Sequence, residues 1–318
     1  PWTARSSGPR MAHYEDQYLD LMRRIWDEGD ERIDRTGVGT RSIFGATMRF
    51  SLADDAVPLL TTKRVYWKAA ARELLWFLSG ETNIRPLVAQ KVGIWTDWPL
   101  DKYRKATGED ISQADFEARI VDDAAFAERW GDLGPVYGKQ WTDWPVYEDA
   151  GEGLYRRRVR GIDQVSEVVE SLRANPGSRR HIIEGWNVAE LPGMALPPCH
   201  KTYQFHVSSG NRLTGLLQQR SCDFALGFPF NIFALALFTR MIAQQAGLEA
   251  HEIVWQGGDV HLYLNHEDLV REQLSRTPGG TPKLKIHRKP DNIHGYRFED
   301  FEVLDYAPQS AISAPVAV

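Results

Sequence analysis

Hydrophobic side chains recur at helical spacing in the first half of the chain. In residues 14–29, apolar positions three or four residues apart predict a helix that ends near Gly29: Tyr18, Leu21, Met22 and Ile25. Residues 67–78 and 164–173 predict two further helices, and residues 101–130, rich in charge and alanine, predict a helical insertion that faces solvent. Residues 41–52 alternate in places between apolar and polar side chains, which predicts a strand.

The second half of the chain has mainly strand-like patterns. Strands are predicted for six segments, with a turn at Ser209-Gly210-Asn211: 181–186, 202–207, 212–220, 253–255, 283–287 and 301–306. Residues 230–246 are apolar on nearly every side, which predicts a buried central helix ended by Gly247. No repeat or linker divides the chain, so we expect one α+β domain over residues 11–318. Met11 looks like a natural start, and residues 1–10 are expected to be a disordered leader or a cloning remnant.

Composition narrows the classes of function. The 318 residues include 42% hydrophobic and 25% charged side chains, which excludes a disordered chain. The formal net charge of −5 argues against nucleic acid as a main partner. No segment approaches the ~20 apolar residues of a membrane span, so no membrane association is expected. With only two cysteines, the chain fits a reducing compartment, and we expect a cytoplasmic location.

One of the two cysteines lies in the segment Pro197-Pro198-Cys199-His200. The prolines fix the backbone before the cysteine, which is then expected at the start of a strand. A nucleophilic cysteine needs a nearby cation, but adjacent strand residues point to opposite faces, so His200 is a poor candidate. Taken alone, this motif favours a packing role for Cys199.

Arginines gather at three places where an anion could bind. Arg220 and Ser221 stand together at a predicted strand end, which suits a phosphate. Arg179 and Arg180 follow a Pro-Gly turn, and Arg35 lies in a turn as well. The alternative for each is a solvated surface arginine.

Polar residues follow two apolar segments. Asn231 begins the predicted central helix, where it is either a helix-start residue or a reader of a base. The Asn amide offers one donor and one acceptor, which complement uracil O4 and N3–H, whereas cytosine presents the reverse order. After an expected turn at Gly257-Gly258, His261 and Tyr263 share one strand face, either as an ordinary polar pair or as part of a site.

In this order, the motifs resemble those of the folate-dependent thymidylate synthase family with a cysteine nucleophile. The resemblance covers essentially residues 11–318 and includes further matching segments: 34–37, 73–78, 131–138, 226–231, 296–301 and 314–318. It implies a large mixed sheet whose back face forms a two-fold homodimer with shared active sites. It also implies reductive methylation of dUMP to dTMP by 5,10-methylenetetrahydrofolate, with no metal.

The resemblance further implies roles for residues at the dUMP site. Cys199 would add to uracil C6, and Arg220 would hold the phosphate and favour the thiolate. Arg35 and Ser221 would bind the same phosphate, and Arg179 and Arg180 would reach it from the other subunit. Asn231 would contact uracil, and Asp223 would contact both dUMP and the folate. His261 and Tyr263 would bind the deoxyribose 3′-hydroxyl.

For the folate side, the resemblance implies a second set of roles. Glu73 and Tyr137 would organise water for removal of the C5 proton. Trp95 and Trp98 would wall the folate pocket, and Asp223 would bond the pterin. Lys63 would contact the glutamate tail of the folate. The cavity would be lined by Leu226, Gly227 and Phe230, and the C-terminus, with Ala317, would close over the bound ligands.

Two other functions compete with this interpretation. A uridylate hydroxymethylase on the same fold would complete the reaction with water in place of hydride, and a cytidylate version would be expected to carry Asp at position 231. A non-catalytic nucleotide- or RNA-binding regulator would be expected to lack the cysteine or to have a basic face. The chain also departs from the family pattern at Lys201 and at Glu184-Gly185, where Ser-Ala is more usual; Lys201 and Glu184 could pair.

Overall fold

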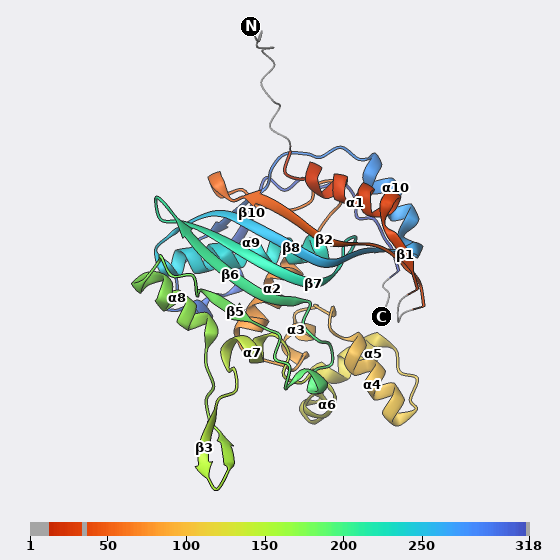
Figure 1. Ribbon diagram of the computed structural model, residues 1–318. Coiled ribbons are helices and arrows are strands. Elements are labelled where there is room, and N and C mark those ends of the chain that lie inside the picture. Colours follow the sequence, from red (N-terminus) through yellow and green to blue (C-terminus); the bar gives the residue numbers. More distant parts are fainter. Residues whose placement is uncertain (1–12, 34–36, 316–318) are drawn as a thin grey trace.

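The computed structural model describes residues 13–33 and 37–315, and within them a six-stranded sheet forms the centre of the molecule (Figure 1). Its strand order is β1-β2-β8-β7-β6-β5, and only the β7–β8 pair is parallel. The predicted α+β class and large mixed sheet are therefore confirmed. The strands are β1 (Asp30–Arg32), β2 (Thr40–Ser51), β5 (Ile182–Glu184), β6 (His200–Ser208), β7 (Arg212–Asp223) and β8 (Glu249–Tyr263).

Helix α9 (Phe228–Ala246) explains the parallel pair. It connects the end of β7 to the start of β8 and packs against both strands, as a crossover between parallel strands must. Its side chains are buried on nearly every side, and Gly247 ends it with a left-handed φ of 74°. The prediction of a buried central helix is thus confirmed. Helices α2 (Trp67–Leu78) and α8 (Gln164–Ala174) pack against it, whereas α1 (Asp16–Glu28) packs against β2 and β8.

Strand β8 corrects one prediction. Gly257 and Gly258 do not form a turn but lie inside this strand, which is much longer than the predicted 253–255. A Cβ on Gly257 would lie 2.3 Å from the Trp255 ring, and one on Gly258 would lie 2.8 Å from the carbonyl oxygen of Arg220. Here glycines mark close approach of neighbouring groups within a strand rather than a reversal of the chain.

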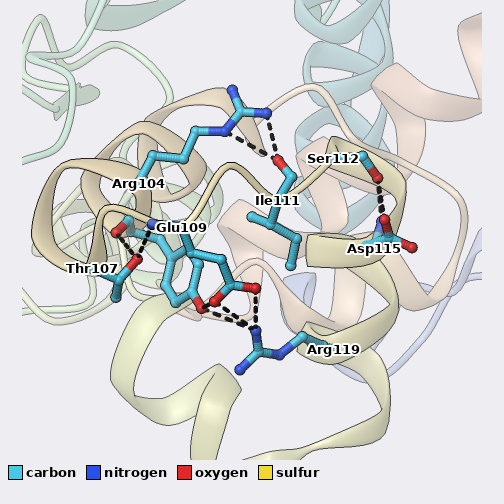
Figure 2. A network of polar contacts seen from close by, with 8 residues as sticks. Arg104, Thr107, Glu109, Ile111, Ser112, Asp115 and Arg119 are labelled. Atoms are coloured by element: carbon cyan, nitrogen blue, oxygen red, sulfur yellow. Dashed lines mark hydrogen bonds and ion pairs between the residues drawn. The ribbon is translucent and has the colours of Figure 1, made fainter.

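The segment 101–130 is helical, as predicted, but it is not simply solvent-facing. Its helices are α4 (Asp97–Thr107), α5 (Gln113–Asp122) and α6 (Ala124–Trp130), and they bury Phe116 and Phe126 between them. Figure 2 shows the polar contacts that hold the loop between α4 and α5 to both helices: Arg104 of α4 donates to the Ile111 carbonyl, and Arg119 of α5 pairs with Glu109 at 3.3 Å. Because α4 begins at Asp97, Trp98 lies in the first turn of this helical segment.

Several short elements were not predicted from the sequence. The hairpin of β3 (Tyr147–Gly151) and β4 (Leu154–Arg157) projects from the body in Figure 1 and is exposed along both strands, so no buried face produced an alternating pattern. The other helices and strands are α3 (Arg85–Ala89), α7 (Gly138–Thr142), α10 (Glu267–Ser275), β9 (Lys283–Ile286) and β10 (Phe301–Leu304). Short 3-10 turns occur at Ala53–Asp55, Leu191–Gly193, Leu264–His266, Ile293–Gly295 and Phe298–Asp300. Across the described ranges, no helix combines the length and apolarity needed to cross a bilayer.

Candidate active site

The register of four neighbouring strands gathers the polar residues at one end of the sheet. The Arg220 N–H donates to the Cys199 carbonyl at 2.9 Å, Ser221 is paired with Asp259, and Asp223 with His261. Together they surround a cavity of about 800 Å³. Its lining comprises Arg32, Ile33, Thr40, Trp98, Leu196, Pro197, Cys199, Arg220, Ser221, Asp223, Asp259, His261 and Tyr263.

The cysteine and arginine predicted to act together lie side by side. Cys199 is partly exposed immediately before β6, and Arg220 Nη2 lies 3.9 Å from its Sγ. The guanidinium is fixed by two further hydrogen bonds, from Nε to the Pro198 carbonyl at 2.9 Å and from Nη2 to the Pro197 carbonyl at 2.7 Å. A cation held this close favours the thiolate form of a cysteine. His200 is buried against Tyr203, in agreement with its exclusion as the direct partner.

Behind the cysteine, Tyr137 contacts the backbone of Cys199. Its hydroxyl oxygen accepts a hydrogen bond from the Cys199 N–H at 2.7 Å. Burial is the main reason that the pKa of Tyr137 is well above its usual value, so the phenol keeps its proton at neutral pH. Tyr137 can therefore act as a proton donor, or orient one, close to Cys199.

Glu73 lies behind the tryptophan wall of the cavity. Trp95 Nε1 donates to Glu73 Oε1 at 2.7 Å, and the Trp95 ring lies 5.2 Å from Trp98, which lines the cavity. The Glu73 side chain keeps some exposed surface, yet protein atoms enclose its carboxyl group, and this desolvation raises its pKa to about 7. A carboxyl poised near neutral pH is suited to taking up and releasing a proton.

His261 and Tyr263 both line the cavity, and His261 has a partner that sequence reasoning did not assign. Asp259 Oδ1 lies 2.9 Å from His261 Nδ1, and Arg32 pairs with the same carboxylate. The hydrogen bond from His261 is the main reason that the pKa of Asp259 is below its usual value, and the nearby Arg32 lowers it further. Arg32 gave no signal because β1 is a short strand with no buried position. Asp259 orients the imidazole so that Nε2 is left for a ligand.

Asn231 belongs to a hydrogen-bonded chain with Gln219 and Trp255. Trp255 Nε1 donates to Gln219 Oε1 at 2.8 Å, and Gln219 Nε2 donates to Asn231 Oδ1 at 2.9 Å. Because indole can only donate, Gln219 must present its oxygen to Trp255 and its NH₂ to Asn231. This fixes the Asn231 amide, although Asn231 is not among the residues that line the cavity.

Four of the residues expected at the folate lie at the end of β7, in the turn after it or at the start of α9: Asp223, Leu226, Gly227 and Phe230. Asp223 Oδ1 accepts hydrogen bonds from the N–H groups of Ala225 and Leu226, at 3.0 and 2.9 Å. Lys63 is buried and donates to the Ala225 carbonyl, and burial lowers its pKa to about 8. Its ammonium is thus engaged inside the protein. Two of these candidates open α9 or immediately precede it: Gly227 and Phe230.

Some predicted residues are not at this cavity. Arg179 is exposed, and Arg180 lines a separate groove of about 410 Å³ between α8 and β5. Arg35 and Ala317 lie outside the described residues. Among the residues that are described, no group of three or more His, Cys, Asp or Glu side chains could hold a metal ion.

Comparison with known proteins agrees with this geometry. The family model described as thymidylate synthase matches residues 16–318. The chain is 72% identical to the thymidylate synthase of Novosphingobium aromaticivorans over 306 residues, which cover 96% of this chain and 97% of that protein. It is also 72% identical to the one of Sphingopyxis alaskensis (96% and 98% covered) and 56% identical to the one of Rhodopseudomonas palustris (97% and 100% covered).

These matches and the site define an enzyme of the methyltransferase class. The chain belongs to the thymidylate synthase family. Residues that sequence reasoning missed or left without a role are Arg32, Thr40, Leu196, Asp259 and Gln219.

Proposed function

We propose that this enzyme converts dUMP to dTMP, with 5,10-methylenetetrahydrofolate as the donor of both the one-carbon unit and the hydride. Family membership supports methylation of dUMP as the reaction. The structural observation that carries the proposal is the Cys199 sulfur, 3.9 Å from Arg220 Nη2 in a polar cavity of about 800 Å³. A thiolate stabilised in this way is the nucleophile that the reaction requires.

In the proposed reaction, Cys199 adds to C6 of uracil and makes C5 nucleophilic. Arg220 and Ser221 bind the phosphate, while His261 and Tyr263 bind the deoxyribose. C5 takes the one-carbon unit and then loses its proton, through water, to the carboxylate of Glu73. Loss of that proton breaks the bond between the one-carbon unit and the tetrahydrofolate nitrogen and leaves a methylene group on C5. Hydride from the tetrahydrofolate then adds to this methylene and expels the Cys199 thiolate from C6, which gives dTMP and dihydrofolate.

The co-substrate would lie beside the nucleotide, against Trp98 and the turn before α9. Trp98 supplies an aromatic wall, and Trp95 supports it from behind at 5.2 Å. Asp223 would bond the pterin through the carboxylate oxygen that does not cap the turn at Ala225. Lys63 and Ala317 remain predicted contacts, to the glutamate tail and as part of the closing C-terminus.

An assay of both products tests this proposal. Purified enzyme with dUMP and 5,10-methylenetetrahydrofolate is expected to yield dTMP and dihydrofolate in equal amounts, measured by mass spectrometry and absorbance. A uridylate hydroxymethylase would instead yield 5-hydroxymethyl-dUMP and tetrahydrofolate. Formation of that pair would overturn reductive methylation and leave the cysteine adduct in place.

Base selection is expected to depend on Asn231. In Asn231→Asp, one carboxylate oxygen can still accept from Gln219 while the other accepts from the cytosine amino group, which the Asn NH₂ would repel. The ratio of kcat/KM for dUMP to that for dCMP is expected to fall at least about tenfold, the scale of one mismatched hydrogen bond. Asn231→Ala is the control, since it removes the Asn contact without adding one for cytosine. An unchanged ratio in Asn231→Asp would refute the assigned role.

Shared sites in a homodimer are part of the proposal, because Arg179 and Arg180 lie away from this chain's own cavity. Mixing Arg179→Ala with Cys199→Ala chains would create heterodimers with one intact site. With random pairing, about a quarter of wild-type activity is expected, because half of the dimers carry one of two sites. Subunit exchange is checked by native mass spectrometry. Verified heterodimers without activity would count against shared sites.

A further inference from the structure

The side chain of Trp186 covers the face of the guanidinium that activates Cys199. The carbon centre of the Arg220 guanidinium lies 5.4 Å from the centre of the Trp186 ring. Two edges of the same group are already held by the carbonyls of Pro198 and Pro197. A cation on an aromatic face gains electrostatic attraction, so the indole holds one face of the guanidinium while the two carbonyls hold its N–H groups.

Trp186 is in turn fixed by Glu184. One carboxylate oxygen of Glu184 accepts the backbone N–H of Trp186 at 2.9 Å, and the other accepts the hydroxyl of Thr202 at 2.7 Å. Thr202 lies on β6, three residues after Cys199. A single carboxylate therefore joins the segment that carries Trp186 to the strand that follows the nucleophile.

The neighbouring Gly185 makes this arrangement possible. Its N–H donates to the Lys201 carbonyl at 2.8 Å, and a Cβ at this position would lie 3.1 Å from the His200 carbonyl oxygen. These contacts explain the unusual Glu184-Gly185 pair, because the glycine permits the close approach to β6 and the glutamate reaches Thr202. Glu184 and Lys201, which the structure describes, form no ion pair within 4.0 Å; the Glu184 carboxylate accepts from Trp186 and Thr202 instead.

We propose that Glu184 and Trp186 are positioning residues that hold the Arg220 guanidinium against the Cys199 sulfur. The proposal rests on the proposed function of Cys199 as the nucleophile. Neither residue lines the cavity, so their effect reaches the substrate only through Arg220. Without the indole, the guanidinium gains freedom to leave the sulfur, and the thiolate population falls.

Alkylation of Cys199 by iodoacetamide measures that population without any substrate. We expect the second-order rate constant at pH 7 to fall about fivefold in Trp186→Leu and by less than about twofold in Trp186→Phe, which keeps an aromatic face. In Glu184→Ala it should fall about threefold, and Glu184→Gln, which keeps an acceptor for the Trp186 N–H, should restore it. The value of kcat/KM for dUMP should follow the same order.

The direction in which the alkylation rate changes distinguishes a positioning role from a loss of packing. Loss of packing alone would expose Cys199 and leave its alkylation unchanged or faster, and either result in a cooperatively unfolding variant would overturn the proposal. If Trp186→Leu does not fold, the pair Glu184→Ala and Glu184→Gln decides. If alkylation follows the expected order but the wild-type enzyme forms no dTMP, the positioning role stands and the proposed function fails.

Discussion

Replacing Cys199 with alanine is expected to lower kcat for dTMP formation by at least about 10⁴-fold, because no other group can form the adduct at C6. The Ala side chain removes only the sulfur, so the contacts of Arg220 with the carbonyls of Pro197 and Pro198 can remain. Binding of dUMP is therefore expected to persist in this variant, measured by calorimetry. Steady-state assays with high enzyme concentration give the residual rate.

The second cysteine offers a matched control. Cys222 is buried, and burial raises the pKa of its thiol well above the usual value, which makes it inert. Cys222→Ala is expected to keep kcat within a few-fold of wild type and to lose some stability. If Cys199→Ala kept more than a hundredth of the wild-type kcat, or if Cys222→Ala lost activity as severely while still folded, the assigned nucleophile would be wrong.

Replacing Glu73 with glutamine is expected to separate activity from stability. The amide can still accept the hydrogen bond from Trp95 but cannot take a proton from C5, so kcat should fall by about 10²–10⁴-fold. In the wild type, kcat should decline below pH 7 as the carboxylate is protonated, since its pKa is about 7. That acid limb should be absent from the residual activity of Glu73→Gln.

The stability of the same variant should change in the opposite direction. Because the folded pKa of Glu73 is raised, the wild type is favoured below the ordinary pKa of 4.5 and loses that advantage as the pH rises to about 7. Above pH 7, Glu73→Gln should therefore be more stable by at most about 3 kcal/mol, with little difference at pH 4.5. Denaturant unfolding at the two pH values measures it. A variant that is less stable at pH 8 would show that the ionised carboxylate is stabilised by its surroundings.

The sequence predicted those elements whose pattern reflects a single buried face or a fully buried helix. The predicted helix 67–78 has the bounds of α2, and the central helix differs from α9 by two residues at its start. The β3–β4 hairpin has no buried face and left no pattern. In β8, the sequence predicted a turn at the two glycines, because their close contacts with Trp255 and Arg220 arise only in the folded chain.

The site was predictable by residue type but not by partnership. Cys199 alone suggested packing, and its role came from the resemblance to a family rather than from local chemistry. Its contact with Arg220 arises because β6 pairs with β7, and the contact between Asp259 and His261 arises at the end of β8. Trp186 stacks on Arg220 from another segment, which no spacing rule can reveal.

The parallel pairing of β7 with β8 also bears on how activity appears during folding. Cys199 and Arg220 belong to a hairpin of local contacts, whereas His261 joins them only after the chain has passed through α9 and returned alongside β7. Pairings between distant segments form slowly because the intervening loop must first be closed. In refolding from denaturant, fast reactivity of the Cys199 thiol should therefore return before nucleotide turnover does.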